Sequence, residues 1–340
     1  MKPNTTPLTR RGLLLTGAAL GAVALAACNS APPREAATPA PAGPAPDRTE
    51  SSGNAVRAQG GLYGVRLYNT RQVADELVWI DENVQPLNGD TKRILITGST
   101  AGAGQLAAAH LLKRGHRVVA HARNEQRAAD VRRDLPGLED VVAGDLLDLD
   151  QTRALAEQIN ALGEFDVIVH NAGEYGLPDG DLLNSNSLSP YLLTALVTPP
   201  RQLSYLTSDL HLGGDLRLDE VRSGGGIGYG DSKLHMAMIA TAAARLWPDR
   251  QVNAVAPGWI PTLMGFHNGN TSTPDSLRDG YLTQVWLAEG VEPGSDVTGE
   301  FLFHQQVETR VNDLVHDTQA QDRLLAVYAE QTGVAFPAES

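Results

Sequence analysis

The sequence predicts an α/β protein built on a doubly wound, parallel sheet of about seven strands with helices on both faces. Short apolar segments alternate with Ala- and Leu-rich helical segments from residue 94 onward, and this alternation implies parallel strands joined by helical crossovers. A glycine-rich turn follows the first apolar segment, and polar motifs follow four later ones. Ligands of such sheets bind beyond the carboxyl ends of the strands, so we expect the functional site at that edge.

Apolar and β-branched composition places the seven strands along the chain. They are residues 94–96, 117–121, 141–144, 167–170, 203–207, 252–256 and 301–303. Three intervening helices are predicted at residues 105–114, 125–134 and 151–162. Gly115 and Gly163 stand directly after two of these helices, where a helix C-terminus favours glycine, and Pro136 ends the helix between them.

A turn rich in glycine joins the first strand to the first helix. In its T-G-x-x-x-G-x-G spacing, Gly98 permits a tight turn, Gly102 lets phosphate oxygens approach the backbone, and Gly104 lets the helix pack closely. The helix N-terminus adds free amides and a positive dipole end for phosphates. This arrangement indicates a Rossmann-type dinucleotide site, whose residues in the turn are Thr97, Gly98, Ser99, Gly102, Ala103 and Gly104. Taken alone, the motif could equally belong to an ordinary glycine-rich loop that binds no nucleotide.

The first 27 residues are predicted to be an export signal. They begin basic, without acidic residues, and continue as an uncharged apolar run shorter than the ~20 residues that span a bilayer. The pair Arg10 and Arg11 resembles a bacterial twin-arginine signal, and residues 25–28 resemble a lipoprotein cleavage box in which Cys28 carries the lipid. We therefore expect an exported protein, lipid-anchored on the outer side of the cytoplasmic membrane, or periplasmic. The alternatives are an ordinary secretory signal and an unused signal on a cytoplasmic enzyme.

Residues 28–55 are rich in Ala, Pro, Ser, Glu and Thr, which predicts a disordered tether. Residues 56–340 are long enough for a single Rossmann-type domain. The chain has 27 Lys and Arg against 40 Asp and Glu; without the three basic residues of the signal 24 remain, a net charge of about −16. This negative charge argues against nucleic acid or an anionic lipid surface as a partner. The expected contact with a membrane is therefore only through the lipid on Cys28. The nine His residues show no ligand spacing, so no metal site is expected.

Five further motifs follow predicted strands or open a predicted helix, in a fixed order. They are Asp145-Leu146, Asn171-Ala172-Gly173, Ser208, Tyr229-x-x-x-Lys233 and Pro257-Gly258-x-Ile260-x-Thr262. Together with the glycine turn they resemble the short-chain dehydrogenase/reductase family over about residues 92–336. The serine, followed by x-x-His and a long insert, is similar to that of the retinol-dehydrogenase-like branch, and His211 is expected to be structural or exposed.

The resemblance implies an NAD(P)-dependent oxidoreductase that interconverts a carbonyl and an alcohol by hydride transfer. Tyr229 would be the general acid/base, and Lys233, on the same helix face at i+4, would lower its pKa from about 10. Ser208 would stabilise charge on the substrate oxygen, and Asn186 would complete the catalytic set. The segment before Asn186 is short for the family, so Asn184 competes for this position, and a helix cap is the alternative role.

The resemblance also assigns cofactor contacts. They are Asp145, Leu146, Asn171, Ala172, Gly173, Tyr229, Lys233, Pro257, Gly258, Ile260 and Thr262. Arg123 follows the second strand, where an acidic residue would bind the unphosphorylated ribose of NAD. Its guanidinium suits a 2′-phosphate, which favours NADP, with NAD as the alternative.

Residues 259–281 are expected to form a mobile lid with an apolar lining, for a small-molecule carbonyl or alcohol. A non-catalytic sensor or scaffold that binds the same cofactor is the alternative function. A sugar-nucleotide epimerase is disfavoured, because its usual glycine spacing differs. The family implies a homodimer or homotetramer packed through the helix that carries Tyr229, and the long insert and the tether make a monomer the alternative.

Overall fold

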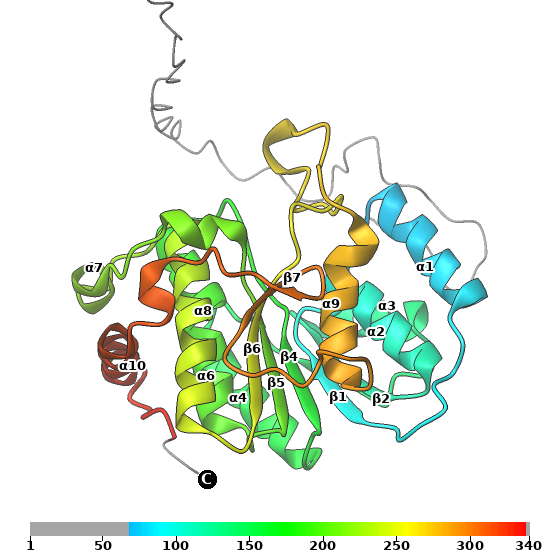
Figure 1. Cartoon of the computed structure of the whole chain (residues 1–340), viewed down its shortest axis with the longest axis horizontal. Helices are drawn as coiled ribbons and strands as arrows, with labels where there is room; N and C mark the ends of the chain where they lie inside the picture. Colours follow the sequence, from blue (N-terminus) through cyan, green and yellow to red (C-terminus); the bar gives the residue numbers. More distant parts are fainter. Residues whose placement is uncertain (1–67, 338–340) are drawn as a thin grey trace, which may run out of the picture. The chain divides into compact units, whose positions relative to one another are not determined.

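The sheet has eight strands in the order β3-β2-β1-β4-β5-β6-β7-β8 (Figure 1). The computed structural model describes residues 68–337, without the side chain of Asn268. The predicted export signal, the tether and Cys28 lie outside the described residues. Seven strands run parallel, and β8 pairs antiparallel with β7. The strands are β1 (Arg93–Ile96), β2 (Arg117–Ala122), β3 (Asp140–Ala143), β4 (Val167–His170), β5 (Gln202–Leu206), β6 (Gln251–Ala256), β7 (Phe301–Phe303) and β8 (Gln306–Val307).

Ten α-helices and four short helical segments connect these strands within the described residues. The α-helices are α1 (Arg71–Asn83), α2 (Gly102–Arg114), α3 (Glu125–Asp134), α4 (Leu149–Ala161), α5 (Asp179–Leu183), α6 (Ser189–Leu196), α7 (Leu218–Arg222), α8 (Tyr229–Leu246), α9 (Leu277–Glu289) and α10 (Thr318–Thr332). The short segments are a π-helix, η1 (Asn184–Leu188), and three 3₁₀-helices, η2 (Asp209–Gly213), η3 (His267–Gly269) and η4 (Asp313–Val315). The predicted strands agree with the structure to within one residue.

Alternating side chains of β1 enter two separate cores, because successive residues of a strand face opposite sides of the sheet. Ile94 and Ile96 pack with α2, α3 and α9, together with Leu106. Leu95 packs on the other face with α4, α6 and α8, together with Ala237. Figure 1 shows these two groups of helices on either side of the sheet. The doubly wound α/β prediction is confirmed, and β1 and β4 adjoin where the strand order reverses, the usual ligand position in such sheets.

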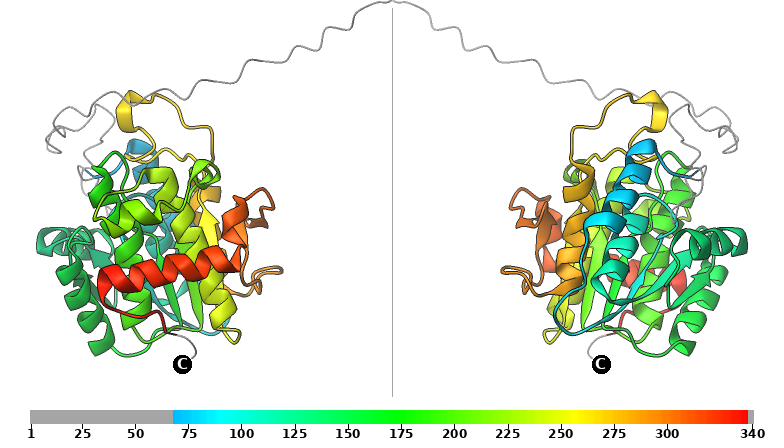
Figure 2. Two further views of the ribbon diagram at one scale, coloured as in Figure 1. Left: turned by 90° about the vertical axis from the view of Figure 1, so that its left-hand side faces the viewer. Right: turned by 90° about the vertical axis from the view of Figure 1, so that its right-hand side faces the viewer.

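A helix that was not predicted, α1, precedes β1 and packs on the outside of α2 and α9 (Figure 2). Arg278 of α9 forms an ion pair with Glu76 of α1 at 2.7 Å, and the Tyr281 hydroxyl donates to the same carboxylate at 2.9 Å. The apolar face of α1 buries Val73, Ala74, Leu77 and Ile80. This helix therefore belongs to the same core as the glycine turn.

The helix that carries the Tyr-x-x-x-Lys motif, α8, is covered on all sides by its own chain. Residues 232–243 of α8 are all buried, and α10 and η4 pack on its outer face. The expected dimer or tetramer packed through this helix stays a prediction. No helix within residues 68–337 is both long enough and apolar enough to cross a membrane.

Candidate active site

The turns that follow β1 and β4 pack against each other at the carboxyl edge of the sheet. Asn171 Nδ2 donates to the carbonyl oxygens of Thr97 at 2.9 Å and Gly98 at 3.3 Å, and Thr97 Oγ1 accepts from the Ala172 amide at 3.0 Å. Gly98 has a φ of 65°, and a Cβ on it would lie 2.8 Å from the Ala172 Cα. A Cβ on Gly104 would lie 2.7 Å from the Gly98 carbonyl oxygen. Only glycine fits either position, and the bare backbone suits a dinucleotide pyrophosphate.

Two side chains hold the glycine turn from beneath. Ser99 Oγ donates to the Ile96 carbonyl oxygen at 2.8 Å and accepts from the His121 amide at 3.1 Å. The His121 ring accepts from the Gly98 amide at its Nδ1, 3.0 Å away, so its Nε2 carries the proton donated to Gly144 at 2.9 Å. Burial lowers the pKa of His121 to about 4, which keeps this neutral tautomer. His121 was not predicted, because no local motif marks a histidine inside a strand.

The loop after β6 reaches the other side of the glycine turn. Gly102 has a φ of 57°, and a Cβ on it would lie 3.4 Å from the Thr262 Cγ2. Gly258 has a φ of 82°, and a Cβ there would lie 2.7 Å from Asp275 Oδ2. The same oxygen accepts from the Trp259 amide at 2.5 Å. The P-G-x-x-x-T segment is thus held beside the first turn of α2.

The remaining predicted cofactor residues lie along the same edge of the sheet. The Asp145 carboxylate accepts from the Leu147 amide at 3.1 Å, which shapes the turn after β3. Four further predicted residues lie in these turns: Ala103, Leu146, Pro257 and Ile260. The apolar side chains of Leu146 and Ile260 are buried. The structure therefore gathers all the predicted motifs at one edge, although they are spread over more than 160 positions.

Tyr229, Ser208 and Lys233 come together where β5 ends and α8 begins. The hydroxyls of Tyr229 and Ser208 lie within hydrogen-bonding reach. The Lys233 Nζ lies 5.5 Å from the centroid of the Tyr229 ring and donates to the Leu206 carbonyl oxygen at 3.0 Å. A Cβ on Gly173 would lie 3.0 Å from this Nζ, so the missing side chain of the N-A-G motif makes room for the ammonium.

Burial shifts the pKa values of the phenol and the ammonium in opposite directions. The buried phenol of Tyr229 has a pKa raised above its usual value, and the Ser208 hydrogen bond offsets only part of this rise. Burial lowers the pKa of Lys233 to about 8. The expected lowering of the Tyr229 pKa is therefore wrong for the chain itself, because removing the phenolate from water outweighs the neighbouring groups. Both groups are protonated at neutral pH.

Asn186 lies next to Lys233, and Asn184 does not. A bidentate pair of bonds joins the Asn186 side chain to the backbone of Glu174: Oδ1 accepts at 2.8 Å and Nδ2 donates at 2.9 Å. Its Oδ1 would lie 3.6 Å from a Cβ on Gly173. Asn184 Nδ2 donates instead to the Leu147 carbonyl oxygen at 3.1 Å. Both belong to η1, and a π-turn of this kind is frequent at functional sites.

Two arginines stand beside the glycine turn at the end of β2. Arg123, predicted to meet a 2′-phosphate, forms an ion pair with Glu174. Arg127 was not predicted; its Nη2 donates to the Thr100 carbonyl oxygen at 3.1 Å and hydroxyl at 2.7 Å. Its guanidinium lies 3.4 Å from the centroid of the Tyr68 ring. Arg127 lies in the first turn of α3, whereas Arg123 precedes the N-cap of that helix, so no helical spacing in the sequence relates the two.

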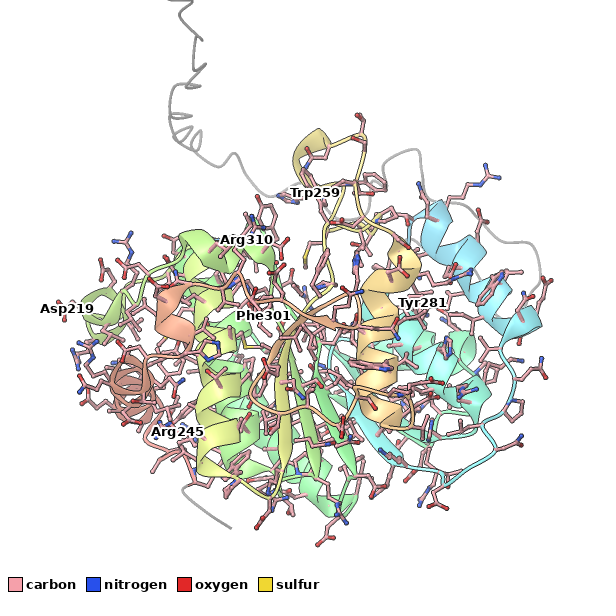
Figure 3. All side chains as sticks on the ribbon, viewed as in Figure 1. Asp219, Arg245, Trp259, Tyr281, Phe301 and Arg310 are labelled. Atoms are coloured by element: carbon pink, nitrogen blue, oxygen red, sulfur yellow. The ribbon has the colours of Figure 1, made fainter. Side chains whose placement is uncertain are left out.

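Aromatic side chains pack against Tyr229, and exposed apolar side chains lie in η2 and in the loop after β6. The Tyr175 ring meets Tyr229 edge-on at a centroid distance of 4.8 Å and meets His267 at 5.2 Å. Trp259 projects from the loop after β6 (Figure 3), and its Nε1 donates to the Gly265 carbonyl oxygen at 2.8 Å. Large apolar side chains that stay exposed in η2 and in this loop are Leu210, Leu212, Trp259, Leu263 and Met264.

His211 is a structural residue, as expected. It is buried, its Nδ1 lies 2.8 Å from the Ser208 carbonyl oxygen, and its ring stacks on Phe301 at 4.4 Å. Asn312 donates from its Nδ2 to the His211 carbonyl oxygen at 3.3 Å. These contacts fix the backbone that carries the Ser208 hydroxyl.

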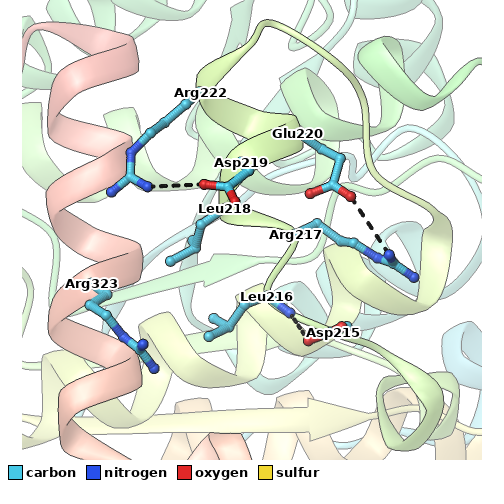
Figure 4. Close-up of a pocket in the computed structure, with 8 residues that line it drawn as sticks. All are labelled: Asp215, Leu216, Arg217, Leu218, Asp219, Glu220, Arg222 and Arg323. Carbon is cyan, nitrogen blue, oxygen red and sulfur yellow. Dashed lines mark hydrogen bonds and ion pairs between the residues drawn. The ribbon is translucent and has the colours of Figure 1, made fainter.

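The long insert between Ser208 and Tyr229 forms a separate hollow away from the proposed catalytic residues. Figure 4 shows this hollow, of about 410 Å³, between α7 and α10. Its charged lining pairs internally, Arg217 with Glu220 at 3.6 Å and Arg222 with Asp219 at 3.4 Å. Because none of its lining residues belongs to the motifs above, the hollow is not the catalytic site.

Comparison with known proteins agrees with this geometry. A family model described as short chain dehydrogenase matches residues 92–190. The short-chain dehydrogenase chry4 of Gibberella zeae is 34% identical over 262 residues, which cover 72% of this chain and 98% of that protein. The chain belongs to the short-chain dehydrogenase family. Human retinol dehydrogenase 14 is a more distant relative within it, 30% identical over 214 residues that cover 52% of this chain and 64% of that protein.

Solved structures share the family fold. An uncharacterized protein from Mycobacterium paratuberculosis superimposes with a TM-score of 0.61 at 21% identity, over 75% of this chain and 98% of that chain. As a member of the short-chain dehydrogenase family, the protein is an oxidoreductase that depends on a nicotinamide dinucleotide. The glycine cradle of Gly98, Gly102 and Gly104, which side chains would fill, fits the pyrophosphate of such a cofactor.

Proposed function

We propose that the chain reduces a carbonyl to an alcohol, and catalyses the reverse reaction, with NADP as its preferred cofactor and Tyr229 as general acid/base. The observation that carries this proposal is the meeting of the Tyr229 and Ser208 hydroxyls with Lys233 at the carboxyl edge of β5. A phenol and a second hydroxyl that converge on one point can both contact a single substrate oxygen.

A bound nicotinamide dinucleotide supplies or accepts the hydride in this family. In reduction, the Tyr229 hydroxyl would give its proton to the carbonyl oxygen, and the bound cofactor would supply the hydride for the carbonyl carbon. Ser208 donates a hydrogen bond to the same oxygen and stabilises the negative charge that develops there. Lys233 stabilises the phenolate left behind, which regains a proton from solvent before the next turnover.

The protonation state of Tyr229 is compatible with its acting as an acid in reduction. Burial raises the pKa of its phenol, so the residue holds a proton at neutral pH and is ready to act as an acid. Lys233, with a pKa of about 8, also stays charged at neutral pH. Asn186 is assigned a supporting role, because its bonds to Glu174 hold the N-A-G turn beside the ammonium.

NADP is supported by charge rather than by homology. Arg123 and Arg127 both lie at the edge of the glycine turn, where the end of β2 meets the adenosine ribose in this fold. Two guanidiniums suit a 2′-phosphate better than two hydroxyls. The Arg123–Glu174 ion pair means that a 2′-phosphate would compete with a carboxylate for this guanidinium.

The exposed apolar side chains of η2 and of the loop after β6 support a bulky, apolar or aromatic carbonyl compound as substrate. Tyr175 and His267 flank Tyr229 with their rings, and the exposed apolar side chains of η2 and the lid would lose contact with water against such a substrate. A polar sugar would find few matching groups on these side chains.

Export with the cofactor already bound is also part of the proposal. The twin-arginine route carries folded proteins, and lipid on Cys28 would then hold the enzyme at the membrane. Fractionation of cells that express the wild type and Cys28→Ser tests the anchor, and mass analysis of the native exported protein tests for retained cofactor. Recovery of both forms only from the cytoplasm would contradict it.

Tyr229→Phe tests the catalytic role. Loss of the proton donor should lower kcat by about 10²- to 10⁴-fold while NADPH binding, followed by its fluorescence, stays within about twofold. Tyr191→Phe is the matched control, because it removes a buried phenol that donates to the Val334 carbonyl oxygen at 2.8 Å. Full turnover by Tyr229→Phe would overturn the assignment of Tyr229 as the general acid/base.

A further inference from the structure

A short segment before α1, residues 68–70, lies across the glycine turn; we call it the strap. Asn69 Oδ1 accepts from the Gly102 amide at 2.9 Å. Asn69 Nδ2 donates to Gln105 Oε1 at 2.6 Å, and both side chains are buried. The strap therefore holds the first turn of α2 by its backbone and by a side chain one turn further on.

The contact with Gly102 replaces a missing helix cap. The residue before α2 is Ala101, whose side chain forms no capping hydrogen bond. The first amides of a helix lack partners within the helix, and a polar side chain at the N-cap usually satisfies one of them. Asn69 does so from 33 positions away. It thus orients the turn whose amides face a bound pyrophosphate in this fold.

The strap also joins the glycine turn to the loop after β6. The Thr70 hydroxyl donates to the Pro261 carbonyl oxygen at 2.7 Å. The next residue of that loop, Thr262, packs over Gly102. One segment therefore connects the pyrophosphate side of the site with the loop that carries the P-G-x-x-x-T motif.

At its other end the strap meets the proposed 2′-phosphate side. The Tyr68 ring stacks on the Arg127 guanidinium, whose carbon lies 3.4 Å from the ring centroid. Arg127 in turn bonds to Thr100 in the glycine turn. Three successive residues thus contact three separate parts of the cofactor-binding edge.

We propose that the strap belongs to the cofactor site, and that Asn69 is a positioning residue for the glycine turn that slows release of NADP(H). Release requires the turn and the β6 loop to separate, and the strap links them. This inference rests on the proposed function, because it requires a nicotinamide dinucleotide at the glycine turn. A slow release would suit an enzyme that keeps its cofactor through export.

The test measures NADPH dissociation from the full chain by stopped-flow fluorescence. Asn69→Ala should raise the dissociation rate and the Kd for NADPH about tenfold, the usual cost of losing a helix cap and its side-chain bond. The KM for a carbonyl substrate and kcat, both at saturating NADPH, should stay within about twofold. Asn83→Ala is the control, because this exposed residue at the far end of α1 bonds only to the Trp79 carbonyl oxygen.

Asn69→Asp provides a second, independent readout. Its carboxylate keeps an acceptor for the Gly102 amide but adds a negative charge near the phosphates. At 1 M salt the Debye length is about 3 Å, so the added charge is largely screened. Under these conditions the affinity of Asn69→Asp for NADPH should be much closer to that of wild type than the affinity of Asn69→Ala is, with all three proteins measured in the same buffer. If Asn69→Ala does not fold, Asn69→Asp is compared with wild type alone, and a loss of about tenfold in affinity at 1 M salt would overturn the inference.

The outcomes separate the two proposals. If the wild-type chain binds neither NADPH nor NADH, the proposed function fails and the strap inference fails with it. If the wild type binds NADPH, and Asn69→Ala releases it at the rate of Asn83→Ala, the strap inference alone is overturned. Equal losses in Asn69→Ala and in Asn69→Asp at high salt would also overturn it, because the Gly102 bond would then be irrelevant.

Discussion

Gly104→Ala probes the closest approach in the glycine turn. Gly104 lies in the first turn of α2, and a Cβ on it would collide with the Asn171 amide and lie 2.7 Å from the Gly98 carbonyl oxygen. Because a backbone oxygen cannot rotate away, α2 or the turn itself must move. Asn171 would then leave its bonds to the carbonyl oxygens of Thr97 and Gly98.

The expected cost follows from these contacts. Two lost hydrogen bonds cost about 1 kcal/mol each, and crowding in a packed region costs about 1 to 3 kcal/mol. The better helix propensity of alanine stabilises the folded chain by about 1 kcal/mol and offsets part of this cost. The net loss in the free energy of unfolding is therefore about 2 to 4 kcal/mol, or roughly 4 to 7 °C in Tm for a domain of this size.

Thermal melting followed by circular dichroism measures this loss, and NADPH titration should show weakened binding in the same variant. Gly180→Ala is the matched control, since Gly180 lies in α5 and a Cβ on it would meet no atom within 4 Å. This control should melt at or slightly above the wild-type temperature. If Gly104→Ala melts with the control and binds NADPH normally, the packing argument for the turn is refuted.

Two further predictions concern charge. Between pH 8 and 10.5 the unfolded chain binds more protons at Lys233 than the folded chain, because burial lowers the folded pKa to about 8. Urea unfolding should show the wild type gaining up to about 3 kcal/mol over Lys233→Met across this range; a constant difference would contradict the shift. Arg123→Leu should weaken NADPH binding by about 10- to 100-fold while sparing NADH, and Glu174→Gln, which removes the competing carboxylate, should strengthen it. Equal loss of NADPH and NADH in Arg123→Leu would exclude the 2′-phosphate role.

Local signals accounted for the fold and the main motifs. The apolar runs around Ile94 and Val252 became strands, and the turn of Gly98 joined a strand to a helix, because such features depend on neighbours within a few residues. The C-terminus of α2 falls at Gly115, whose φ is 97°. By contrast α1 was missed, although Thr70 caps its N-terminus and Val73, Leu77 and Ile80 recur on one face at helical spacing.

Electrostatic details depended on distant partners. Glu174, which follows the N-A-G motif, forms an ion pair with the Arg123 guanidinium, although no spacing in the sequence relates the two residues. The sign of the Tyr229 shift was also wrong in the sequence analysis. The neighbouring Lys233 was visible as a motif, but the burial that outweighs it is a property of the folded chain.

The sequence by itself determined the α/β class, the positions of seven strands along the chain and the residue types at the site, because hydrophobic periodicity, glycine conformation and helix spacing are local properties. Only the tertiary structure decided that Asn69 caps α2, that His121 holds the glycine turn and that Asn186 rather than Asn184 lies beside Lys233. These contacts join residues far apart in the chain. Their hydrogen bonds form only after the two cores have packed and brought the strand ends to one edge.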